Sequence, residues 1–71
     1  MEFRDAVMKV LRDEGGELHW TVIQDLALTR GYLDPFTQPE IRKGVLAALA
    51  DAVRAGDIER RGTGVYALPG V

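Results

Sequence analysis

The sequence contains no cysteine and no serine. Without cysteine the chain can form no disulfide and offers no thiolate to zinc, so disulfide-stapled folds and cysteine-based zinc sites are excluded. Without serine there is no serine nucleophile. The single histidine, His19, has no second histidine or cysteine with which to share a metal ion. The sequence therefore predicts no metal site, no cofactor and no catalytic residue, and we expect a protein that is not an enzyme.

Long apolar runs are missing as well. None approaches the roughly 20 residues that a bilayer-spanning helix needs. The first ten residues include Glu2 and Asp5 and lack the basic-then-apolar order of a signal peptide. We therefore expect a cytoplasmic protein that makes no membrane contact.

Basic charge is not in excess either. Nine basic and eleven acidic residues give a formal charge of −2. This balance disfavours a strong non-specific polyelectrolyte binder, because phosphate contacts dominate nucleic-acid affinity. The two halves differ, however: residues 1–36 hold four basic and seven acidic side chains, and residues 37–71 hold five and four. A surface that binds an anionic partner is therefore expected in the second half.

What is present is the composition of a small globular domain. The chain has 71 residues, of which 46% are hydrophobic and 28% charged. A chain of this size buries only about 60% of the surface that it exposes when unfolded. We expect one domain over residues 1–71, with a thin margin of stability.

Hydrophobic spacing predicts three helices, over residues 2–13, 22–30 and 38–55. The first has one apolar stripe, and glycines follow all three, which is typical of helix ends. Thr21 with Gln24, and Thr37 with Glu40, fit capping boxes at the starts of the second and third helices. The residues predicted to face inward in the first and third helices are Phe3, Ala6, Val7, Val10, Leu11, Ile41, Val45, Leu46, Leu49, Ala52 and Val53.

Two features of the sequence are unusual for their predicted positions: a glycine inside the third helix and an apolar connection before it. Gly44 lies inside the third helix, where glycine costs about 1 kcal/mol relative to alanine. We expect it to allow close packing against the second helix; close approach to a binding partner is the alternative. In the connection over residues 32–36, Tyr32, Leu33 and Phe36 are too apolar for a free loop. We expect at least two of these three to cover the core.

Three short stretches predict strands. Residues 17–20 alternate, with Leu18 and Trp20 on an inner face and His19 toward solvent. Residues 58–60 and 65–68 flank a glycine-rich tip and predict a hairpin, with Ile58, Tyr66 and Leu68 facing inward. The lone first strand satisfies its backbone groups by pairing with this hairpin. The predicted fold is α+β: a three-helix bundle with a small three-stranded antiparallel sheet.

This order of elements resembles the winged helix-turn-helix superfamily. The opening stretch, AVMKVLRDEGGELHWTVIQDLALTRGYL, is similar to HARE-type helix-turn-helix domains. The closing stretch, LAALADAVRAGDIERRGTGVYAL, is similar to the winged-helix domain at the N-terminus of Mrr-type restriction endonucleases. Their nuclease domain has no counterpart in this chain, so the resemblance implies no cleavage.

The resemblance implies a regulatory protein that binds double-stranded DNA, with the third helix in the major groove and the wing on the backbone. The positions that match DNA-contacting ones are Gln38, Arg42, Lys43, Arg60, Arg61 and Thr63. For Arg42 and Lys43 the alternative is that they lie on a solvated helix face. For the neighbouring wing arginines, Arg60 and Arg61, the alternative is an ion pair with Glu59 or a nearby acid. Glu40 and Asp51 dilute the basic helix, and the wing is short.

Winged helices also serve as protein-interaction modules, because a fold does not fix a function. The alternative reading is therefore a homodimer or an adaptor that docks on a larger protein. The apolar Tyr32, Leu33 and Phe36 and the net negative charge favour this alternative. The sequence leaves the choice open.

Overall fold

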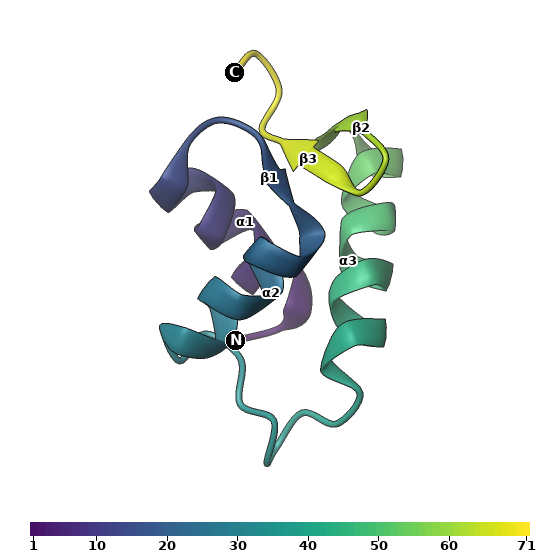
Figure 1. Ribbon diagram of the computed structural model, residues 1–71. Coiled ribbons are helices and arrows are strands. Elements are labelled where there is room, and N and C mark those ends of the chain that lie inside the picture. The colour runs from purple at the N-terminus through teal and green to yellow at the C-terminus, as the bar shows by residue number, and fades with distance from the viewer.

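The computed structural model describes residues 1–71. The elements are α1 (Phe3–Glu14), β1 (Leu18–His19), α2 (Trp20–Thr29), α3 (Ile41–Ala55), β2 (Glu59–Gly62) and β3 (Val65–Ala67). The helices form a bundle and the sheet closes one end of it (Figure 1). The chain is thus a compact α+β domain with winged-helix topology, and the predicted fold class is confirmed. No helix combines the length and the apolar character that crossing a membrane requires.

The core is a single cluster of buried apolar side chains to which all three helices contribute. Its members are Ala6, Val7, Val10, Leu11, Ile23, Ala27, Leu33, Val45, Ala48, Leu49, Ala52 and Ile58. The predicted stripe of α1 is correct, although Phe3 is only half-buried. Ala48 and Ala67 are buried without having been predicted, whereas Tyr66 and Leu68 are half-buried against the cluster.

The sheet has β3 in its centre and the order β1-β3-β2, with both pairings antiparallel. Leu18 of β1 lies opposite Tyr66, so the predicted pairing of the lone first strand with the hairpin is confirmed. The pairing of β2 with β3 shifts register between Arg60 and Gly62. A β-bulge therefore sits at Arg61, and it decides how the wing arginines point.

The start of α2 differs from the prediction. His19, not Thr21, is the N-cap: its Nδ1 accepts the Thr21 N–H at 3.3 Å and lies 2.8 Å from the Thr21 hydroxyl. Trp20 belongs to the helix and donates its own N–H to the Gly64 carbonyl at 2.8 Å. Because the strand hydrogen bonds run up to Trp20, the helix starts directly after β1. Gln24 closes no capping box, and its buried Oε1 has no partner.

The start of α3 also differs, because the helix begins at Ile41 and not at Gln38. Glu40 precedes it with a φ of 56°, and no side chain caps the helix. Gln38 instead closes the connection: its Oε1 accepts the Asp34 N–H at 3.1 Å, and its Nε2 donates to the Met1 carbonyl at 2.7 Å. The predicted position of Gln38 on the outer side of the third helix is therefore wrong.

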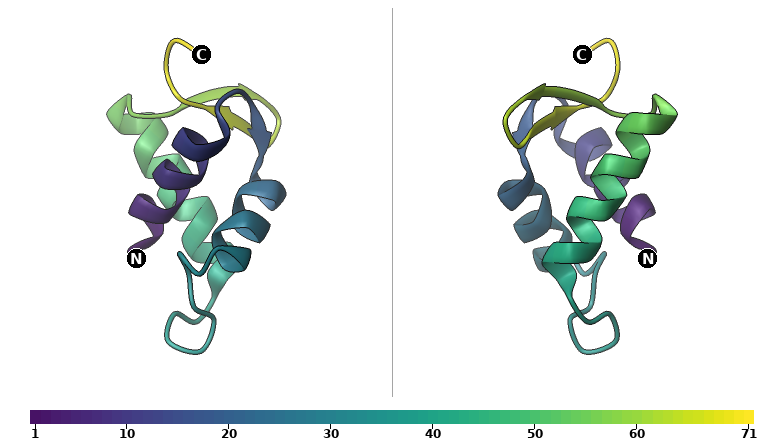
Figure 2. Two further views of the ribbon diagram at one scale, coloured as in Figure 1. Left: turned by 90° about the vertical axis from the view of Figure 1, so that its left-hand side faces the viewer. Right: turned by 90° about the vertical axis from the view of Figure 1, so that its right-hand side faces the viewer.

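The connection between α2 and α3 protrudes at the end of the molecule away from the sheet (Figure 2). Leu33 is buried in the core and Tyr32 is half-buried against it, which confirms the expectation for two of the three apolar residues. Phe36 is 96% exposed at the protruding end. No other large apolar side chain in the structure is exposed to this extent.

Gly44 permits a close helix crossing, as predicted, but its neighbour is α1 and not α2. A Cβ added at Gly44 would lie 2.5 Å from Cε1 and Cε2 of the Phe3 ring. The half-buried phenyl ring of Phe3 thus lies directly on the backbone of α3. The prediction that Gly44 packs against the second helix is wrong, because α3 packs more extensively on α1 than on α2.

Gly44→Ala is expected to have opposite effects with and without Phe3. In the natural chain the added methyl group displaces the ring, and we expect a loss of about 1 kcal/mol of unfolding free energy. In a Phe3→Ala background the better helix propensity of alanine should give a gain of up to about 1 kcal/mol. Urea denaturation of the four proteins measures both effects. Equal effects in the two backgrounds would contradict the proposed contact.

A polar cluster joins the end of α1 to the end of α2. The Tyr32 hydroxyl donates to Oδ2 of Asp13 at 2.7 Å, and Arg30 lies 2.6 Å from Glu14 and 3.5 Å from Asp13. The hydrogen bond from Tyr32, helped by the charges of Lys9 and Arg30, lowers the pKa of Asp13. The hydrogen bond with Glu14 raises the pKa of Arg30.

Tyr32→Phe is expected to raise the pKa of Asp13 toward its ordinary value. The folded pKa of this carboxyl lies below the unfolded value of about 3.9, so its stabilisation is present above that pH. It is lost as the pH falls through the folded pKa. Carboxyl chemical shifts in an NMR titration measure the change. Tyr66→Phe is the control, because Tyr66 lies in β3 and should leave Asp13 unchanged.

Candidate nucleic-acid interface

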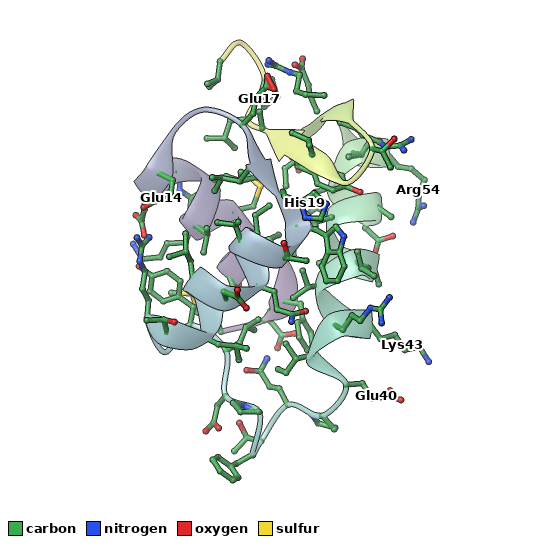
Figure 3. All side chains as sticks on the ribbon, viewed as in Figure 1. Glu14, Glu17, His19, Glu40, Lys43 and Arg54 are labelled. Atoms are coloured by element: carbon green, nitrogen blue, oxygen red, sulfur yellow. The ribbon has the colours of Figure 1, made fainter.

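The outer side of α3 carries a row of exposed residues, called here the α3 face: Lys43, Ala47, Ala50 and Arg54. Their spacing of four, three and four residues places them on one side of a helix. Lys43 and Arg54 point away from the bundle on the same side (Figure 3). Ala47 and Ala50, which lie between these two cations in the row, carry only methyl groups, so a partner can approach the helix closely there, with the exposed Asp51 beside Ala50.

The hairpin extends this face. Gly56 ends α3 in the left-handed conformation, with a φ of 82°, which glycine adopts without steric cost. Asp57 and Ile58 then both direct their N–H groups to the Ala52 carbonyl, so the chain turns back at once into β2. The result is an open groove between helix and hairpin, called here the α3–hairpin groove and lined by Ala50, Val53, Arg54, Arg60 and Tyr66.

The ion pairs divide the nine basic side chains into two groups. Five have a carboxylate within 4.0 Å: Arg4, Lys9, Arg30, Arg54 and Arg61. The other four, which are Arg12, Arg42, Lys43 and Arg60, have none. Three of these four belong to α3 or β2, so most of the cations without an ion-pair partner lie on the third helix and the hairpin.

Arg60 and Arg61, on either side of the register shift in β2, have different environments. Arg60 is exposed, lines the α3–hairpin groove and has no ion-pair partner. The side chain of Arg61 is only 25% exposed; it lies 2.8 Å from Glu59 and 4.0 Å from Glu17. The alternative that an acid pairs with a wing arginine thus holds for Arg61. Thr63 is exposed in the turn beside Arg60.

Arg42 lies on a different side of α3 from Lys43. Its guanidinium carbon is 5.5 Å from the centre of the Trp20 ring, a distance suited to a cation–π contact. Trp20 is half-buried and packs on the core, so the predicted role of this ring in the core is correct. The contact leaves the guanidinium without a carboxylate and fixes its direction relative to α2.

The tip of the hairpin rests on the start of α2. A Cβ at Gly64 would lie 2.8 Å from Nε2 of His19 and 3.1 Å from Cδ1 of Trp20. The Gly64 carbonyl also accepts the N–H of Trp20. The wing is therefore held against the bundle, and its position relative to α3 is fixed.

Acidic side chains interrupt the positive surface at two places. Asp51 pairs with Arg54 one turn along α3. Glu40 is exposed just before α3, points outward near Lys43, and has no ion-pair partner (Figure 3). Nowhere do three histidine, aspartate or glutamate side chains gather in a way that could hold a metal ion.

The structure brings Lys43 and Arg60 to one side of the molecule, with Arg42 nearby, and separates Gln38 and Arg61 from them by engaging their side chains elsewhere. Arg54 was missed as a site residue, although its spacing of eleven from Lys43 was a usable signal. Comparisons of the chain with protein-family models, with curated proteins and with solved structures gave no match. The assignment of the fold therefore stands on its topology.

Proposed function

We propose that this chain is a small winged-helix module that binds duplex DNA through the α3 face and β2. The observation that carries the proposal is the distribution of uncommitted cations. Elsewhere on the surface nearly every arginine and lysine is paired within the molecule, whereas Arg42, Lys43 and Arg60 are left for an external anion. Lysine and arginine side chains spaced along a surface are typical partners of the phosphate groups spaced along DNA.

In this proposal α3 enters the major groove, which is wide enough for a helix. Lys43 and Arg54, at either end of the α3 face, contact phosphates, Arg54 by exchanging its ion pair with Asp51. The methyl side chains of Ala47 and Ala50 let the helix approach. Arg60 and Thr63 contact the backbone from the wing. Arg42, oriented by Trp20, is the side chain placed to read a base edge, because arginine pairs bidentately with guanine.

The binding is expected to be weak in a single module. One such module buries roughly 600–1,000 Å² of protein surface, and Glu40 and Asp51 oppose the phosphate charge. A regulatory role therefore needs two modules on one site, or a larger assembly that adds contacts. Nothing in the proposal requires chemistry on the DNA, and the role is binding, not catalysis.

A fluorescence-anisotropy titration of a labelled duplex at several salt concentrations tests the proposal. Each neutralised phosphate contributes a slope of about −0.9 to the plot of log affinity against log salt. Three or four contacts predict a slope of about −3. Absence of binding at the lowest salt concentration would rule the proposal out.

One observation favours a second function. Phe36 is 96% exposed on a connection that hydrogen bonds hold in place, so the ring is presented to a partner in a fixed position. A protein-interaction module without DNA binding would explain this residue. It would leave the unpaired cations of α3 and β2 unexplained, so we rank it second.

A further inference from the structure

The α3–hairpin groove combines an apolar floor with a cationic rim. We call its apolar lining residues, Ala50, Val53 and Tyr66, the floor, and its two arginines the rim. Arg54 of the rim pairs with Asp51, whereas Arg60 has no ion-pair partner. The groove volume of about 350 Å³ is at the small end of the range for ligand sites in proteins. Such a groove suits a single aromatic side chain that arrives with negative charge beside it.

The connection between α2 and α3 offers that combination. Phe36 is fully in solvent, and the carboxylates nearest to it in the sequence, Asp34 and Glu40, have no ion-pair partner. We call residues 34–40 the Phe36 loop. It is the only place in the chain where a large apolar side chain is almost completely exposed.

The Phe36 loop is also held in one conformation. Oδ1 of Asp34 accepts the Phe36 N–H at 2.9 Å, and the Asp34 carbonyl accepts the N–H groups of Thr37 and Gln38 at 3.2 and 2.8 Å. Gln38 then ties the loop to the Met1 carbonyl at 2.7 Å. A loop ordered in advance loses little conformational entropy when it binds, which favours its use as an anchor.

We propose that the Phe36 loop of one copy docks in the α3–hairpin groove of a second copy of this chain. The ring of Phe36 lies on Tyr66 and Val53, and Asp34 and Glu40 face the arginines at the rim. Charge complementarity selects this occupant: an aromatic flanked by free carboxylates meets an apolar floor flanked by guanidinium groups. Arg54 and Arg60 are also among the cations assigned to DNA above, so a docked loop and DNA compete for them, but the self-association is tested without DNA.

The loop and the groove lie toward opposite ends of the molecule, since the groove is next to the sheet and the loop is at the far end (Figure 1). The contact therefore joins two different surfaces and is heterologous. One copy retains a free loop and the other a free groove. This asymmetry makes the contact testable by mixing variants that are each defective on one side.

Sedimentation equilibrium of the natural chain, over concentrations from about 10 μM to 1 mM, measures the association that one anchoring side chain supports. We expect a mass that rises with concentration and falls with added salt. Phe36→Ala should weaken the association about tenfold or more, as for an interface anchor. Val22→Ala, which shortens another exposed apolar side chain, is the matched control and should change nothing.

Ala50→Glu blocks the groove, because Ala50 is exposed and the new carboxylate lies one turn from Arg54. At the lowest concentration at which the natural chain associates, the Phe36→Ala chain and the Ala50→Glu chain should each stay monomeric when alone. Mixed together they should form a one-to-one complex, because the first retains its groove and the second its loop. Circular dichroism confirms that each variant is folded.

Four results would overturn the proposal. They are a natural chain that stays monomeric at 1 mM, a Phe36→Ala chain that associates as strongly as the natural one, a Val22→Ala chain as defective as Phe36→Ala, and a mixture without a complex. A further decisive readout is duplex binding by monomeric Phe36→Ala. At protein concentrations too low for the natural chain to associate, unchanged binding supports the proposal, and weaker binding would assign the loop to DNA instead.

Discussion

Gly64→Ala is expected to lower the free energy of unfolding by about 2–4 kcal/mol. The φ of Gly64 is +72°, a conformation that costs an L residue about 1–2 kcal/mol. The new Cβ would also lie 2.8 Å from His19 and 3.1 Å from Trp20, and overpacking of this kind costs about 1–3 kcal/mol. Because small domains have only about 5–15 kcal/mol of stability in total, this is a large fraction.

The matched control is Gly62→Ala, two residues earlier in the same hairpin. A Cβ there would have ordinary contacts, the nearest at 3.8 Å from Val65, and the φ is not positive. We expect a change of less than about 1 kcal/mol. Urea denaturation followed by circular dichroism compares the two variants. Similar losses in both would show that the hairpin tip is not seated on α2 as described.

The second large effect concerns DNA. Replacing Lys43, Arg54 and Arg60 together with alanine is expected to weaken duplex binding about 100- to 1,000-fold at low salt. Each lost phosphate contact removes about 0.9 from the salt slope, so three contacts should flatten it by nearly three. Anisotropy titrations at several salt concentrations measure both quantities.

The control for this variant is the triple alanine substitution of Arg4, Lys9 and Arg12. It changes the net charge by the same amount but lies entirely on α1. At about 0.1 M salt, where charges beyond about 10 Å are screened, the control should bind DNA within about threefold of the natural chain. Equal losses in both triple variants would mean that net charge, and not the α3 face, governs binding.

Asp51→Asn is expected to raise the affinity for DNA, in contrast to the triple alanine variant. It releases Arg54 from its ion pair and removes one carboxylate from the α3 face. Exposed ion pairs contribute about 1 kcal/mol or less, so the fold should tolerate the loss. DNA affinity should rise about two- to fivefold at low salt, which is the gain expected when a repulsion of up to about 1 kcal/mol is removed.

The helices and the sheet were predictable because their periodicities are local and strong. The starts of α2 and α3 were not, because contacts distant in sequence decide them. His19 caps α2 in place of Thr21 while its strand pairs with β3, and Gln38 is held outside α3 by the Met1 carbonyl. A capping-box pattern weighs only four neighbouring residues and cannot include either partner.

For the candidate site, too, the sequence predicts what local patterns decide and misses what distant contacts decide. Helical spacing identified Lys43 as outward, and strand alternation required one of two wing arginines to be available. Which one is available depends on the bulge at Arg61 and on its partner Glu17, and a local pattern contains neither. The exposure of Phe36 was likewise hidden, because the sequence shows its apolar character but not the hydrogen bonds that turn it outward.

The bulge in β2 has a consequence for the behaviour of the protein at high concentration. In the order β1-β3-β2 the strand β2 is an edge, and an edge strand offers unpaired backbone groups to any other extended chain. The bulge and the arginines of β2 interrupt the flat, uncharged surface that fibril growth requires. We therefore expect the β2 edge to resist aggregation by strand addition.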